Sequence, residues 1–321
     1  VDRRQRQMCI RDSFVTLRAV HPYGSPSSGL DSYTDWYGDV LTHELAHYLH
    51  LDAVSGFPGF TRRIFGCVVH PNASVPLFLR EGYATYAETF AARAGGDASG
   101  RGVSPVTDMF VRTSVSGGAF LGLDRASNDV SAWPGALGHY LFGVSFLEHL
   151  AGTAGEASLH EFNRRTSRTC PYLWNLRFKE VYGMSMREAW NAWGTSERAG
   201  QAARIADIAG GGLTELSPVN GRTGNVFGLD IDSSGTLVAY AIRPADREGG
   251  LYLYDRSSGK ERLLAKGIYP IGIAFDGSGR TLYYLRGETR KNVYYRKNLF
   301  AFDAEKRVER RITRGGLSLI H

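Results

Sequence analysis

The sequence predicts an α+β protein, in which a mostly helical domain at residues 14–205 is followed by an all-β region at residues 213–316. Apolar residues recur at helical spacing up to about residue 205. After the glycine triplet at 210–212, short runs rich in Tyr, Leu and Val alternate with turns that contain Asp, Ser and Gly. With 321 residues and 43% hydrophobic content, the chain is long enough for two packed domains.

The two ends of the chain are expected to be adapter-derived rather than native. Residues 3–13 (RRQRQMCIRDS) back-translate to a stretch that reads as a sequencing-library transposon adapter. Residues 317–321 (LSLIH) back-translate to the reverse complement of part of that stretch. We therefore exclude residues 1–13 and 317–321 from the fold, as one would a tag, and expect the native protein to be longer at both ends.

Within the helical domain, the most informative pattern is HELAH at residues 43–47. On an α-helix, His43 and His47 are neighbours that reach a common point, and Glu44 lies one step round the helix. Imidazoles can hold Zn²⁺, and a free carboxylate beside it can take a proton from water. Two core histidines with a surface Glu44 are the alternative, but buried polar groups without partners cost about 1–3 kcal/mol each, which favours a metal.

Catalytic zinc usually has three protein ligands, and a second helix predicted over residues 76–88 offers Glu81 as the third. With HELAH, this segment makes the chain resemble the gluzincin zinc metallopeptidases, and most of all the bacterial peptidase-MA-like group. That group has the string P-x-W-x-x-E-G-x-A-x-Y, which residues 76–86 match except that Phe78 stands in place of Trp. The resemblance implies that Glu81 binds Zn²⁺ together with the two histidines, and that Glu44 is the general base.

Three further residues have two interpretations each. Glu88, seven residues after Glu81, would either brace a metal ligand by a hydrogen bond or lie on the solvated surface. The segment 139–147 resembles the gluzincin helix that supplies a donor to the oxyanion, for which Tyr140 is the first candidate and His139 the second. For both of these, an aromatic helix packed under the site is the alternative.

The all-β region contains two copies of one pattern. A run with a turn and a strand (232–240 and 276–284) is followed in each copy by a run that starts Leu-Tyr-Leu-Tyr-Asp or Leu-Phe-Ala-Phe-Asp (251–264 and 299–313). A period of 44 to 48 residues with turns between strands is typical of propeller blades with four strands each. The strings resemble TolB-type repeats, so residues 213–316 are predicted to form a partial β-propeller of about two blades.

Acidic residues of these repeats have a simpler explanation than metal binding. Each of them occupies a turn, where an Asp side chain caps its own backbone; they are Asp232, Asp255, Asp276 and Asp303. Propellers usually bind a partner or restrict access to an attached site, so a protein partner is expected here. No run of Lys and Arg is interleaved with aromatic residues, which argues against nucleic acid.

The leading functional hypothesis is zinc-dependent hydrolysis of internal bonds in peptide or protein substrates. Internal cleavage is favoured because the Gly-Met-Glu-Asn type string of related aminopeptidases is missing between Phe14 and Thr42. The alternative is a peptide- or protein-binding scaffold with a structural or vestigial zinc site, and a non-peptide hydrolase is a third. The resemblance implies a bacterial extracytoplasmic protein, periplasmic or on the cell surface. A membrane anchor and any pairing of Cys67 with Cys170 are not readable from the sequence.

Overall fold

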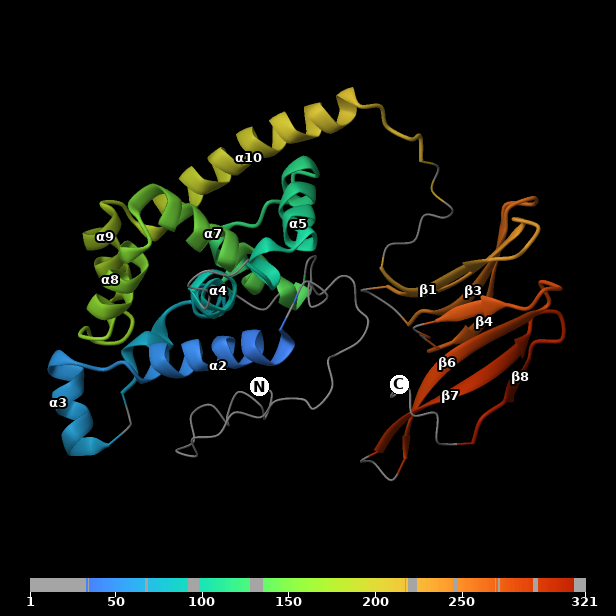
Figure 1. Ribbon diagram of the computed structural model, residues 1–321, viewed down its shortest axis with the longest axis horizontal. Helices are drawn as coiled ribbons and strands as arrows, with labels where there is room; N and C mark the ends of the chain where they lie inside the picture. The colour runs from blue at the N-terminus through green and yellow to red at the C-terminus, as the bar shows by residue number, and fades with distance from the viewer. Residues whose placement is uncertain are drawn as a thin grey trace. The chain divides into compact units, whose positions relative to one another are not determined.

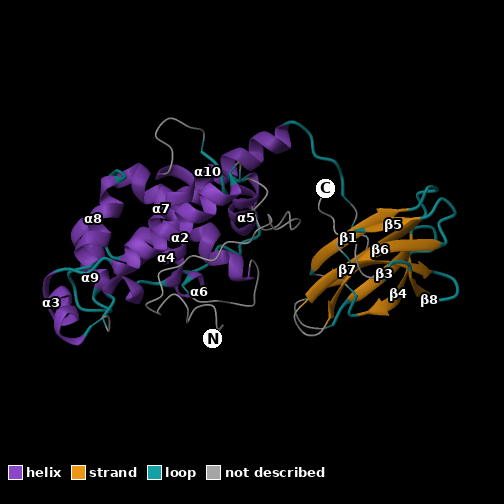
Figure 2. Cartoon of the chain, turned by 60° about the horizontal axis from the view of Figure 1, so that its bottom comes forward, coloured by secondary structure: helices purple, strands orange, loops and turns teal. Residues whose placement is uncertain are grey.

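The computed structural model describes residues 33, 35–66, 69–91, 98–127, 135–216, 218, 224–244, 248–268, 270, 272–290 and 294–314. Both predicted adapter segments and Cys67 lie outside these residues. The chain divides into two compact units, Val1–Leu213 and Thr214–His321. Helices make up the first and antiparallel strands the second, which confirms the predicted order of a helical part and then a β part (Figures 1 and 2).

The helices of the first unit are α2 (Trp36–Asp52), α3 (Gly56–Phe65), α4 (Leu77–Tyr86), α5 (Pro105–Ser116), α6 (Leu123–Ala126), α7 (Gly138–Ala154), α8 (Ala157–Thr166), α9 (Trp174–Tyr182) and α10 (Met186–Gly210). Single turns of 3₁₀ helix form η3 (Pro71–Ser74), η5 (Arg101–Val103) and η6 (Gly135–Leu137), and the π-helix η4 (Ala87–Ala91) continues α4. Among the described residues, no helix is long and apolar enough to cross a membrane.

Local sequence explains where several helices begin. The Asp35 carboxylate accepts a hydrogen bond from Gly38 N at 3.1 Å and caps α2. Ser104 caps α5, in which Pro105 occupies the first position, where a proline is favoured. Ser185 and Glu188 form a capping box at the start of α10. The two helices that carry the candidate metal ligands, α2 and α4, therefore belong to a unit with well-defined element boundaries.

Aromatic side chains fill the core of the helical unit and hold α4 in place. Phe78, Phe146 and Trp190 are all at most 2% exposed, and the ring centroid of Trp190 lies 5.1 Å from those of Phe78 and Phe146. α4 packs against α2 on one side and α7 on the other (Figure 1). Gly82 and Gly143 allow the closest approach of α4 and α7, because a Cβ on Gly143 would lie 2.2 Å from the Phe78 carbonyl oxygen.

The second unit contains two four-stranded sheets whose strands follow chain order, and every pairing is antiparallel. The first sheet comprises β1 (Asn225–Ile231), β2 (Leu237–Arg243), β3 (Gly250–Asp255) and β4 (Lys260–Lys266). The second comprises β5 (Ile273–Phe275), β6 (Thr281–Arg290), β7 (Tyr294–Asp303) and β8 (Val308–Arg311). Within the described residues, the sheets do not close into a barrel or a ring.

The predicted turn aspartates cap their own backbone. Asp232 accepts hydrogen bonds from Thr236 N and Leu237 N at 2.8 and 2.7 Å. Asp276 does the same for Arg280 N and Thr281 N at 3.0 and 3.1 Å. Asp255 accepts from Ser257 N at 2.8 Å, and Asp303 from Lys306 N at 2.8 Å. These bonds account for the four carboxylates without a metal.

Candidate metal centre

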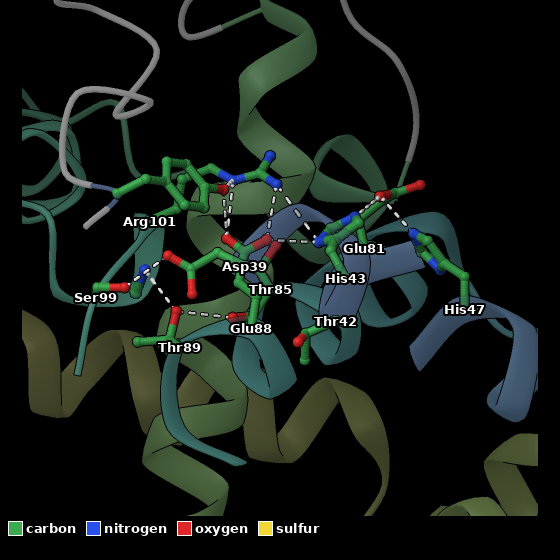
Figure 3. A network of polar contacts seen from close by, with 12 residues as sticks. Asp39, Thr42, His43, His47, Glu81, Thr85, Glu88, Thr89, Ser99 and Arg101 are labelled. Carbon is green, nitrogen blue, oxygen red and sulfur yellow. Dashed lines mark hydrogen bonds and ion pairs between the residues drawn. The ribbon is translucent and has the colours of Figure 1, made fainter. Parts of the chain in front are cut away.

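The three predicted metal ligands lie together in the helical unit. His43 and His47 come from α2 and Glu81 from α4, and their side chains converge (Figure 3). Glu81 Oε2 lies 3.1 Å from His47 Nε2 and 3.6 Å from His43 Nε2. All three residues are buried, and one ligand atom of each lies within 4.8 Å of the other two. The group can therefore hold a metal ion.

The donor atoms fit a divalent transition-metal ion. Two ligands bound to one tetrahedral Zn²⁺ at about 2.1 Å stand about 3.4 Å apart, close to the two distances from Glu81 Oε2. Two imidazole nitrogens and a carboxylate oxygen are also a donor set that catalytic zinc uses. Burial lowers the pKa of His43, but its hydrogen bonds to Glu81 and Glu88 outweigh this and raise it. The site thus favours a positive charge, which a metal ion would supply in place of a proton.

Glu88 orients His43. Its carboxylate is fully buried, which rules out the surface interpretation of this residue. Glu88 Oε2 lies 2.8 Å from His43 Nδ1, so with a metal bound a proton on Nδ1 would donate to Glu88 and leave the Nε2 lone pair for the ion. Burial would raise the pKa of Glu88, but the charge of Arg101 and the bond to His43 hold it at about 2. Glu88 therefore stays ionised in the interior.

Tyr140 and Glu44 flank the ligands. Tyr140, on α7, has its ring centroid 6.2 Å from that of His43, and the ring of His139 lies 4.6 Å from that of Tyr140 at an interplanar angle of 42°. Burial raises the pKa of Tyr140, and the Glu81 carboxylate adds to this by its charge and as hydrogen-bond acceptor. The Glu44 carboxylate contributes further to this rise. Glu44 is only partly buried and follows His43 on α2, so a carboxylate open to solvent stands beside a metal ligand in the sequence of this helix.

Sequence reasoning missed Arg101 and Tyr33. The Arg101 guanidinium donates two hydrogen bonds to Glu88, Nε to Oε1 and Nη2 to Oε2, both at 3.1 Å. Tyr33 Oη donates to Glu88 Oε1 at 2.7 Å. These residues are separated from Glu88 by 13 and 55 positions, and neither stands in a spacing pattern. Only the fold brings them to the site, so no signal in the sequence could have identified them.

Two further histidines near this region are not metal ligands. His50 is buried beside α4, and burial, followed by the charges of His47 and Arg80, lowers its pKa to about 3. His70 Nδ1 lies 3.3 Å from the Leu51 carbonyl oxygen. Both residues are structural, since the group of ligand atoms found among the described residues contains neither.

Comparisons with known proteins add little. No family model and no curated protein matches the chain. A solved structure, "Crystal structure of the tricorn protease", is similar at 19% identity with a TM-score of 0.24, over 28% of this chain and 9% of that one. The chain thus spans under a tenth of the length of that protein. The functional assignment therefore depends on the residues of the site itself.

Proposed function

We propose that this protein is a zinc metallopeptidase of gluzincin type, similar to the bacterial peptidase-MA-like group, that hydrolyses internal bonds of peptides or proteins. One observation carries the proposal. His43, His47 and Glu81 converge from two helices at distances that suit one ion, with Glu44 next to His43 on the same helix. The match of HELAH and of residues 76–86 to that group gives independent support.

A bound Zn²⁺ would supply positive charge to polarise a substrate carbonyl and would lower the pKa of a water molecule. Glu44 would accept the proton of the attacking water and pass it to the leaving amine. Tyr140 would donate a hydrogen bond to the oxyanion of the transition state, since its raised pKa keeps the phenol protonated at neutral pH. Glu88 would keep Nε2 of His43 directed at the ion.

The β unit is proposed to form two blades of a TolB-type propeller that binds a protein partner. Ala239, Ala241, Leu251 and Leu253 of the first sheet pack in one cluster with Leu282, Tyr284, Phe300 and Phe302 of the second. The counterparts of these last four in the first sheet, Val238, Tyr240, Tyr252 and Tyr254, lie on its other face. Each sheet would thus offer opposite faces to its two neighbours, as successive blades do. A bacterial extracytoplasmic location belongs to the same proposal and rests on the family likeness alone.

The test is cleavage of fluorescently labelled casein by the wild-type chain and by Glu44→Gln, with zinc content measured on the same samples. We expect Glu44→Gln to lose at least about 10²-fold in rate, the usual contribution of a general base, while keeping about one zinc per chain. Glu156→Gln, at an exposed position before α8, is the matched control and should cleave like wild type. Wild-type rates in Glu44→Gln would refute the role of Glu44. If wild type, Glu44→Gln and Glu156→Gln all bind zinc and none cleaves casein, the alternative of a peptide- or protein-binding scaffold is favoured.

A further inference from the structure

Arg101 contacts two residues of the candidate site, Glu88 and Tyr140. On one side, its guanidinium forms the paired hydrogen bonds to Glu88, the carboxylate that holds His43 (Figure 3). On the other, the guanidinium carbon lies 4.5 Å from the centroid of the Tyr140 ring, within the range of a cation–π contact. One side chain therefore touches the partner of a metal ligand and also the proposed oxyanion donor.

The backbone fixes Arg101 firmly. Gly100 precedes it with φ of 83°, a conformation that favours glycine, and a Cβ there would lie 3.3 Å from the Tyr33 ring. The carbonyl of Arg101 accepts a hydrogen bond from Thr107 Oγ1 at 2.6 Å, and the next amide, Gly102 N, donates to Thr89 Oγ1 at 3.1 Å. These contacts hold the backbone from which the Arg101 side chain extends, and that side chain is only 11% exposed.

We propose that Arg101 is a positioning residue that fixes the metal ligand His43, through Glu88, and the ring of Tyr140 in one arrangement. This inference rests on the proposed function and deepens it. Arginine suits the task because its planar fork binds a carboxylate with two parallel bonds while its face stacks on an aromatic ring. Lysine offers the charge but neither the fork nor the flat face. The two substitutions Arg101→Lys and Arg101→Met therefore separate charge from geometry.

The first measurement is zinc affinity by competition with a chromogenic chelator, which does not depend on activity. Arg101→Met should bind zinc about 10- to 100-fold more weakly than wild type, which is the usual loss when the residues that hydrogen-bond to a metal ligand are changed. Arg101→Lys should recover most of that affinity, because the ammonium still neutralises Glu88. Arg112→Met is the matched control: it removes an arginine paired with Asp108 in the same unit, and its affinity should equal that of wild type.

The second measurement is a double-mutant cycle with Tyr140→Phe in the casein assay. In the wild-type background, Tyr140→Phe should lower kcat about 10²- to 10³-fold, as the loss of one oxyanion donor does. In the Arg101→Lys and Arg101→Met backgrounds it should lower kcat less than about 10-fold, since the phenol is already misplaced. If Arg101→Met does not fold, Arg101→Met combined with Glu88→Gln removes both buried charges and replaces it in the cycle.

The outcomes separate this inference from the proposed function. If wild type binds zinc and cleaves casein, but both Arg101 variants match wild type in zinc affinity and show an additive effect of Tyr140→Phe, the inference is overturned and the proposed function stands. If wild type binds zinc without cleavage, the affinity series alone decides about Arg101. A wild-type chain that binds no zinc overturns both.

Discussion

Replacing Gly143 with alanine should separate the two helices that position Glu81. Gly143 lies where α7 crosses α4, and its Cβ would lie 2.2 Å from the Phe78 carbonyl oxygen and 2.9 Å from Gly82 Cα. Such contacts are essentially never below 3.0 Å, so α4 would have to move by at least 0.8 Å (3.0 minus 2.2). The obstacle is backbone, which cannot rotate away. Overpacking of this kind costs about 1–3 kcal/mol, more than the ~1 kcal/mol that alanine gains over glycine in a helix.

Urea unfolding followed by far-UV circular dichroism measures this effect. We expect Gly143→Ala to lower the free energy of unfolding of the helical unit by up to about 2 kcal/mol, which is the overpacking cost less the helix gain of alanine, and to weaken zinc binding because Glu81 moves with α4. The matched control is Gly152→Ala on the same helix, where an added Cβ meets nothing within 4 Å. That variant should be as stable as wild type or up to ~1 kcal/mol more stable. Equal stability of the two variants would refute the close-approach argument.

Two further predictions concern stability. The pKa of His50 is about 3 in the folded protein, against an ordinary value of 6.5. Its contribution to the free energy of unfolding is therefore complete above pH 6.5 and is lost as the pH falls towards 3. Between pH 7 and pH 5, the free energy of unfolding should therefore fall by about 2 kcal/mol more in wild type than in His50→Asn, and an equal fall in both would contradict this. Trp190 Nε1 donates a hydrogen bond to the carbonyl oxygen of the buried residue Leu121 at 3.0 Å. Trp190→Phe should therefore lower the free energy of unfolding by about 1–3 kcal/mol in a denaturant titration. An unchanged midpoint would contradict the role of this bond.

Local patterns in the sequence predicted most of the site. The spacing of His43 and His47 follows from helix geometry, and Glu81 was identified through a string of neighbours whose apolar members pack in the core. Whether Glu88 is buried could not be predicted. Its spacing of seven residues from Glu81 gives its side of the helix, but not whether other elements cover that side. The structure resolves this, since η4 continues α4 as a π-helix and buries Glu88 against α2.

Arg101 could not be predicted from local sequence patterns. Its interaction with Glu88 depends on the turn at Gly100 and on the way η5 returns to α4, both of which are tertiary features. For the β unit, the repeat predicted two sheets of four strands with capped turns, and these are present. Closure of a ring needs contacts between sheets beyond these two, which local periodicity does not specify.

The most direct test is a crystal structure of the zinc-loaded protein, with the ion located by its anomalous scattering. The account predicts one zinc ion about 2.0–2.2 Å from His43 Nε2, His47 Nε2 and a Glu81 oxygen, with Glu88 still bonded to His43 Nδ1. An ion bound elsewhere, or a Glu81 carboxylate turned away with no other ligand in its place, would contradict it.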